Sequence, residues 1–342
     1  MASQSANIIG ITMGCPVGIG PEVALKFLAG DQDWQDFLPV VVGDAGVLEK
    51  NAAMLGLRVK MRAWQPGEEW SPGHINVYNV AEFDASADLK TGQLILGLPN
   101  RRTGQAMASY IKAAVNMLQT GQMAAMVTCP ISKAALQQAG YSYPGHTEML
   151  ADLCQTEDFA MMMAGKSLKV TLVTIHQSLS SVALGLQSAA IVKLIELSGR
   201  SLQRDFGISR PRMAVAGLNP HAGENGIFGD EESRIIAPAI ARACQLGWQV
   251  EGPFPPDTVF NHAVAGKFDL VVCMYHDQGL IPFKLLHFYD GVNVTIGLPI
   301  VRTSVDHGTA YDIAGQGLAN PASLAAAFAM AAEIAANRMR VT

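Results

Sequence analysis

Short apolar runs alternate with longer segments of helical periodicity along the whole chain, and this alternation limits the possible folds more than any other feature. A short continuous apolar run is typical of a buried strand, whereas apolar positions at helical spacing are typical of a helix. Strands that alternate with helices form a largely parallel sheet that helices cover. The sequence therefore predicts an α/β fold.

The predicted elements follow one another without an internal repeat or a low-complexity linker. The expected strands are 8–12, 39–42, 75–80, 124–128, 159–163, 170–174, 212–216, 270–274 and 292–296. The expected helices are one from about residue 21, then 45–55, 104–118, 147–153, 189–204, 230–245 and 322–338. In open α/β sheets ligands bind at the carboxyl ends of the strands, so the loops after the strands are the places to search for a site.

Composition excludes several classes of protein. Hydrophobic residues make up 49% of the chain and charged residues 15%, which is enough apolar material for a core and excludes intrinsic disorder. The net charge of −5, without a long basic run, argues against a nucleic-acid partner. Two uncharged stretches, 113–132 and 313–332, contain Asn and Pro, so neither is typical of a membrane span.

The N-terminus and the cysteines indicate a compartment. No basic segment precedes the first apolar run, so a signal peptide is not expected. The five cysteines form no CxxC pair, which is typical of reduced thiols. We therefore expect a cytoplasmic protein without a membrane partner.

Three predicted strands are each followed by a histidine, namely His176, His221 and His276. Neighbouring strands lie about 4.8 Å apart, so side chains at their ends can converge on one ion. Three neutral imidazoles suit a catalytic divalent metal, often zinc. No HExxH motif is present, so the alternative of three structural histidines stays open at this point.

Cationic and glycine-rich positions point to an anionic ligand. Lys284, Asn293 and Arg302 follow one another at nine-residue intervals, and Arg302 comes after a buried run. A cation there requires an anion, either a substrate phosphate or an aspartate in an ion pair. His146 and Thr147 stand where a loop enters a helix. Either both donate to a phosphate, or Thr147 is only the N-cap of that helix.

Two further loops are rich in small residues. Residues 14–22 include three glycines but no GxGxxG, so they either face an anion or form a tight turn. Residues 306–321 allow the backbone to approach a flat ligand closely.

Seven segments together resemble the 4-hydroxythreonine-4-phosphate dehydrogenase family of vitamin B6 biosynthesis. They run in the family's order from residue 10 to about residue 320: ITMGCPVGIGPE, GHTE, TIH, GLNPHAGE, MYHDQGLIPFK, GVNVTIGLP and RTSVDHGTA. The final loop, HGTAYDIAGQGLANP, is also similar to the cofactor loop of isopropylmalate dehydrogenases. The resemblance implies a two-domain isocitrate/isopropylmalate dehydrogenase-like fold with a cleft between the domains. We expect 1–130 plus 300–342 in the first domain and 131–299 in the second.

The resemblance also implies roles for individual residues. The implied ligands of a divalent metal (Zn, Mg or Co) are His176, His221 and His276. The implied substrate contacts are His146, Thr147, Lys284, Asn293 and Arg302. The implied contacts to NAD or NADP are Gly223, Glu224, Asp306, His307 and Gly308. Asp277 or Lys133 is expected to relay a proton, and a homodimer with the active site at its interface is expected.

The implied reaction is an oxidation at C3 of 4-phosphooxy-threonine, followed by decarboxylation to 3-amino-2-oxopropyl phosphate. The alternative within the family is a dehydrogenase of 4-phospho-threonate or erythronate, whereas the intact GHTE and RTSVDHG segments disfavour the dihydrodiol branch. Cys15, Val17 and residues 97–106 depart from the family's pattern. A metal-dependent hydrolase and a non-catalytic metal- or phosphate-binding protein are the rivals from other classes.

Overall fold

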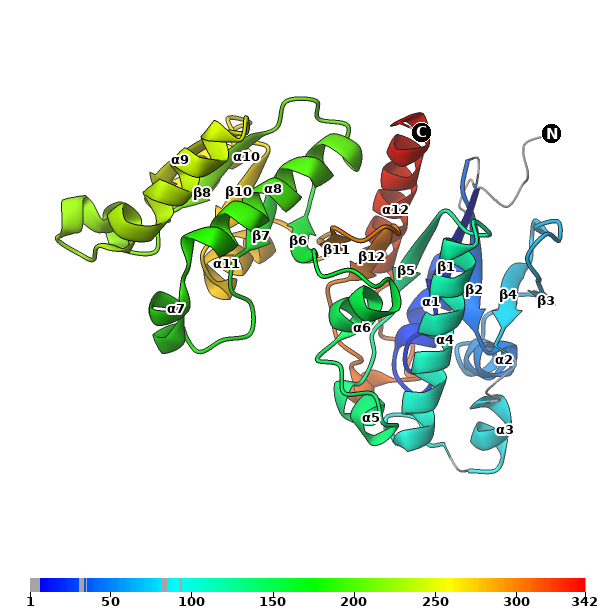
Figure 1. The fold of residues 1–342 in the computed structure, drawn as a ribbon. Helices are drawn as coiled ribbons and strands as arrows, with labels where there is room; N and C mark the ends of the chain where they lie inside the picture. Colours follow the sequence, from blue (N-terminus) through cyan, green and yellow to red (C-terminus); the bar gives the residue numbers. More distant parts are fainter. Residues whose placement is uncertain (1–6, 31–33, 35, 81–84, 93, 342) are drawn as a thin grey trace. The chain divides into compact units, whose positions relative to one another are not determined.

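The computed structural model describes residues 7–30, 34, 36–80, 85–92 and 94–341 (Figure 1). The chain divides into two compact units. The first unit comprises Met1–Glu157 and Leu298–Ala335, and the second comprises Asp158–Gly297 and Ala336–Thr342. Residues 131–157, expected in the second domain, lie in the first unit because α5 (Lys133–Gln138) packs tightly on α4 (Arg101–Gln119). Gly104 allows this approach, since a Cβ at this position would clash with the Ala135 carbonyl oxygen.

The first unit is built on parallel strands in the order β3-β4-β2-β1-β5-β12. Their bounds are β1 Ile8–Thr12, β2 Leu38–Gly43, β3 Met61–Ala63, β4 Ile75–Asn79, β5 Ala125–Thr128 and β12 Arg302–Val305. The other helices are α1 Gly20–Leu28, α2 Ala45–Met54, α3 Ala85–Lys90, α6 His146–Leu153 and α12 Ala322–Val341, whose last residues belong to the second unit. β1 is buried at every position, as expected for a strand in a parallel sheet that is covered on both faces.

The second unit has strands in the order β11-β6-β7-β10-β8-β9. Their bounds are β6 Ala160–Ala164, β7 Lys169–Leu172, β8 Arg212–Ala216, β9 Gln249–Phe254, β10 Leu270–Cys273 and β11 Val292–Ile296. β11–β6 and β6–β7 pair antiparallel, while β7–β10, β10–β8 and β8–β9 pair parallel. The helices are α7 Leu179–Gly185, α8 Ser188–Arg204, α9 Ala237–Gln245, α10 Val259–Val264 and α11 His276–Leu286.

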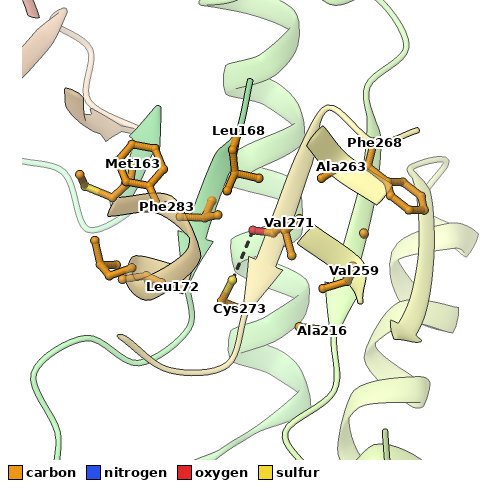
Figure 2. Packing of buried hydrophobic residues seen from close by; sticks show 13 residues of the cluster. Met163, Leu168, Leu172, Ala216, Val259, Ala263, Phe268, Val271, Cys273 and Phe283 are labelled. Atoms are coloured by element: carbon orange, nitrogen blue, oxygen red, sulfur yellow. Dashed lines mark hydrogen bonds between the residues drawn. The ribbon is translucent and has the colours of Figure 1, made fainter. Parts of the chain in front are cut away.

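The core of the second unit joins α10 and α11 to the central strands (Figure 2). Phe283 of α11 and Phe268, before β10, are both buried in this cluster, together with Val271 of β10. Burying such side chains contributes roughly 1.5–3 kcal/mol each. This packing holds the strand ends from which the histidine loops leave.

The α/β prediction is confirmed, and most expected strands lie within two residues of their predicted bounds. The helix expected over 230–245 is divided into a π turn, Glu232–Ile236, and α9. Three strands, β3, β9 and β12, and five helices, α3, α5, α7, α10 and α11, were not predicted, because they are short or because their apolar residues are few or interrupted by Gly and Pro. Among the described residues no single helix is long and apolar enough to cross a membrane. The bent pair of helices α7 and α8 together has the length and composition of a span, and nothing else indicates one.

Candidate functional site

The three histidines expected to bind a metal follow three strands that are neighbours in the sheet. β10 lies between β7 and β8 and pairs in parallel with both, with Val271 opposite Val170 on one side and Ala214 on the other. The carboxyl ends of these strands therefore lie at one edge of the sheet, and His176, His221 and His276 come after them. The order of the strands therefore allows the three histidines to converge, as the sequence predicts.

The side chains themselves are only partly brought together. The ring centres of His176 and His276 are 6.1 Å apart, whereas the ring of His221 packs 6.0 Å from that of Phe228. Zinc lies about 2.0–2.1 Å from an imidazole nitrogen, so the first spacing needs only a small movement for a shared ion. In the described part of the chain, no group of three or more His, Cys, Asp or Glu side chains is placed to hold a metal ion.

Asp277 orients the imidazole of His276. Its Oδ1 lies 2.6 Å from His276 Nδ1, and a carboxylate only accepts, so Nδ1 carries the proton and donates. The lone pair is then on Nε2, which is the arrangement that carboxylates impose on metal-binding histidines.

His221 stands on a turn of unusual backbone conformation. Five consecutive residues, 221–225, have φ between 44° and 83°, and four of them are not glycine. Left-handed backbone costs roughly 1–2 kcal/mol per residue with a side chain. Strain of this kind persists only where the surroundings hold it, and it is concentrated at functional sites.

Glu232, which is 5% exposed, stabilises this turn through hydrogen bonds. Its Oε1 accepts from the backbone N–H groups of Leu218 and Asn219, both at 2.7 Å, and its Oε2 accepts from Asn219 Nδ2 at 3.0 Å. Gly223 fits above the carboxylate because its missing Cβ would lie 2.7 Å from Glu232 Oε2. Hydrogen bonds to a charged group contribute about 1.5–3 kcal/mol each, enough to offset the backbone strain. Glu232 was not predicted from the sequence, because it lies in the charged segment 230–234 and nothing there distinguishes it from its neighbours.

In the first unit, the buried Arg302 lies near His146, a half-buried residue whose Nε2 is buried. Arg302 is 3% exposed, and its Nε and Nη2 donate to Thr128 Oγ1 at 3.1 and 2.7 Å. Burial lowers the pKa of Arg302, while the Glu148 carboxylate acts to raise it. Burial, followed by the nearby Arg302 charge, lowers the pKa of His146 well below 6.5, so its imidazole is neutral at pH 7.

His146 Nε2 is buried and makes no hydrogen bond with the residues that the structure describes. A buried polar atom normally has a partner, so this nitrogen beside a buried guanidinium suits a phosphate or carboxylate. Thr147 is not the N-cap of α6, as one interpretation of the sequence had it. Gly145 occupies that position, and no side chain caps the helix, so Thr147 Oγ1 is not used as an N-cap.

Lys284 and Asn293, also expected to bind substrate, belong to the second unit. Lys284 lies in the last turn of α11, and Asn293 lies on β11 opposite Met163. Asn293 Oδ1 is buried and makes no hydrogen bond with the described residues, so it has capacity for a ligand.

A fully buried carboxylate also holds the last glycine-rich loop. Glu22 of α1 accepts from Ala319 N–H at 2.8 Å and from Gly317 N–H at 3.3 Å. Lys26 lies 2.9 Å from Glu22 Oε1 and donates to the Gly317 and Ala319 carbonyl oxygens at 2.6 and 2.8 Å. Neither residue was predicted, although two lone charges within an apolar helix indicate a buried pair.

Residues expected to contact the cofactor lie along this loop and in the turn after β8. Asp306 N–H donates to Ser323 Oγ at 3.1 Å, and His307 Nδ1 lies 3.1 Å from the Gly308 oxygen. Gly308 is open to solvent, Gly223 is buried in the left-handed turn, and Glu224 is exposed beside it.

The glycine-rich loop at 14–22 favours the tight-turn interpretation over an anion site. Gly14 has φ +71°, and Cys15 N–H donates to the Pro130 oxygen at 2.9 Å. Ile19 N–H donates to the Thr309 oxygen at 3.1 Å, so this loop supports the last one. Lys133 is an exposed residue at the start of α5, where Ser132 is the N-cap.

Comparison with known proteins identifies relatives over nearly the whole chain. A 4-hydroxythreonine-4-phosphate dehydrogenase of Desulfosudis oleivorans is 52% identical over 332 residues, 96% of each chain. A D-threonate 4-phosphate dehydrogenase of Salmonella typhimurium is 44% identical, covering 97% of this chain and 100% of the relative. The crystal structure of 4-hydroxythreonine-4-phosphate dehydrogenase from Klebsiella pneumoniae matches with a TM-score of 0.87 at 44% identity, covering 96% of this chain and 99% of that one.

The fold, the buried polar site and these relatives define an enzyme of the dehydrogenase class, an oxidoreductase built from two α/β units. More narrowly, the chain belongs to the pyridoxal phosphate biosynthetic protein PdxA family, whose profile matches residues 35–331. The expected family and enzyme class are confirmed.

Proposed function

We propose that the chain oxidises 4-hydroxythreonine 4-phosphate at C3 with NAD or NADP, and that the product decarboxylates to 3-amino-2-oxopropyl phosphate. The observation that carries the proposal is the buried Arg302 beside His146 Nε2, which has no hydrogen-bond partner among the described residues. A guanidinium can bind two phosphate oxygens at once, and buried polar atoms of this kind need such a partner. The names of close relatives support the same substrate.

In this proposal, each residue of the substrate site has a distinct role. Arg302 binds the phosphate, and the neutral His146 and Thr147 donate to it from the start of α6. Lys284 and Asn293 complete the set of substrate contacts. Arg302 keeps its orientation because Thr128 Oγ1 accepts from two of its nitrogens.

A divalent metal, Zn, Mg or Co, is proposed at His176, His221 and His276. The adjacent parallel strands and the 6.1 Å spacing of two of the rings support this set. When bound, such an ion lowers the pKa of a substrate hydroxyl as a Lewis acid. Asp277 supports the site by holding the proton on His276 Nδ1.

The proton from the substrate hydroxyl leaves to Asp277 or Lys133. Asp277 has its carboxylate beside His276, whereas Lys133 offers an exposed amine at the start of α5. The variants Asp277→Asn and Lys133→Met distinguish the two residues. Only the variant that removes the residue that accepts the proton should flatten the pH dependence of kcat.

NAD or NADP is proposed to contact Gly223, Glu224, Asp306, His307 and Gly308. The small residues of the last loop support close approach of a nicotinamide cofactor, and Glu22 holds that loop in place.

A cytoplasmic homodimer with its active site at the interface is proposed as the working form. Exposed apolar side chains of the second unit support an interface: Leu184, Ile281, Leu285, Phe288 and Tyr289. Sedimentation at micromolar concentration tests the dimer.

The second candidate substrate is D-threonate 4-phosphate, which the Salmonella relative supports. Its phosphate suits the same Arg302 site. Reduction of NAD or NADP is measured with each substrate, with and without a chelator. Faster turnover of 4-hydroxythreonine 4-phosphate supports the first proposal, and turnover of D-threonate 4-phosphate alone replaces it with the second. Turnover of neither substrate rejects both.

A further inference from the structure

His287 is a buried imidazole that the proposed reaction does not use. It follows α11, is 4% exposed, and its ring centre lies 5.3 Å from that of Phe283. The ring also lies against the β6–β7 hairpin at Gly165, where any Cβ would clash with the imidazole. The position of the ring is therefore determined by packing.

A serine and an aspartate hydrogen-bond to the two nitrogens of this ring. Asp290 has both carboxylate oxygens 3.2 Å from His287 Nδ1, and Ser167 Oγ lies 2.8 Å from Nε2. The carboxylate only accepts, so Nδ1 carries the proton and Nε2 accepts from the Ser167 hydroxyl. This order of aspartate, histidine and serine hydroxyl is that of an activated nucleophile.

A cavity of about 220 Å³ adjoins the serine, which is exposed in the hairpin turn. Ser167 lines it together with residues that include Lys166, Lys169, Ile208, Phe268 and Asp269. The apolar residues accommodate a short acyl chain. The two lysines outnumber the Asp269 carboxylate, so the lining is net positive, which favours a carbonyl oxygen that gains negative charge.

We propose that Ser167 is a nucleophile with His287 as its general base and Asp290 as a positioning residue, and that it accepts acyl groups from small activated esters. Ser167 Oγ bonds to the carbonyl carbon while its proton passes to His287 Nε2. The bond to the leaving alcohol then breaks, and His287 returns the proton to that oxygen. Water releases the acid in a second, equivalent step and regenerates the serine.

The probe is p-nitrophenyl acetate, applied to the full-length enzyme. We measure release of p-nitrophenolate and the acetylation of individual serines by peptide mass spectrometry. Ser167 should react at least about tenfold faster than the exposed Ser209, because general-base activation contributes roughly 10²–10⁴-fold. Ser167→Ala should abolish the fast phase, whereas the matched control Ser209→Ala should retain it.

Asp290→Asn separates activation from a structural role. It should slow acetylation of Ser167 relative to Ser209 in the same molecule and change the pH profile of that ratio, and Asp290→Glu should restore much of it. Folding of each variant is checked by circular dichroism, which also makes His287→Asn interpretable. Equal labelling of Ser167 and Ser209 in the native enzyme, or a ratio that His287→Asn and Asp290→Asn leave unchanged, overturns the proposal and leaves the three residues as a clasp between the hairpin and α11.

Discussion

Both units hold an irregular loop on a buried glutamate, but they balance the buried charge differently. In the first unit Glu22 is paired with Lys26, and the two residues together bond to the N–H and C=O groups of the 317–319 segment. In the second unit Glu232 accepts from amide N–H donors below the left-handed turn. The first loop therefore depends on an ion pair, whereas the second depends on hydrogen bonds that offset backbone strain.

The largest effect is expected from Glu22→Gln. It leaves Lys26 without its carboxylate and places an amide where two backbone N–H groups need an acceptor, so the free energy of unfolding should fall by about 3 kcal/mol. Chemical denaturation measures it. The double variant Glu22→Met/Lys26→Met should not recover the loss, because it leaves the Gly317 and Ala319 backbone groups without their side-chain partners. A loss below about 1 kcal/mol in the single variant would contradict the ion-pair account.

Arg302→Ala tests the anion site of the first unit. Loss of hydrogen bonds to a charged group costs about 1.5–3 kcal/mol, equivalent to roughly a 10- to 150-fold rise in KM for the phosphorylated substrate. KM for NAD or NADP should change little. Steady-state kinetics with each reactant varied in turn measures both, and equal rises would exclude a phosphate-specific role.

Gly223→Ala tests the strained turn of the second unit. The new Cβ meets Glu232 Oε2 at a position with φ +83°, so the free energy of unfolding should fall by about 1–3 kcal/mol. The clash, but not the φ strain, should disappear when Glu232 is replaced by Ala. A double-mutant cycle by denaturation measures this coupling, and strictly additive effects would mean that the turn does not rest on the carboxylate.

The smallest effect is the pH dependence contributed by His146, whose pKa is lowered well below 6.5 in the folded protein. The unfolded chain binds this proton first, so stability should be fully present above pH 6.5. It should fall by up to about 1.4 kcal/mol per unit as pH decreases towards the folded pKa. His146→Leu should flatten this part of the curve of unfolding free energy against pH. An unchanged slope would contradict the buried, neutral imidazole.

The strands and the candidate site could be predicted to different extents. Apolar periodicity located β1, β7, β8 and β10, because these strands are buried and regular. It did not locate β12, because Arg302 and two hydroxyl residues interrupt its apolar pattern. The histidines after the strands were recognised from their positions, whereas the two glutamates that hold the loops were not.

The sequence by itself determined the α/β class, the positions of most strands and the residue types available at their ends, because these depend on neighbours along the chain. Tertiary structure decided which strand ends are adjacent, placing β10 between β7 and β8. It also decided long-range contacts such as that of Glu22 with Ala319, 297 residues away, and that of Ser167 with His287, 120 residues away. Such pairs depend on packing and burial, and local periodicity carries no information about either partner.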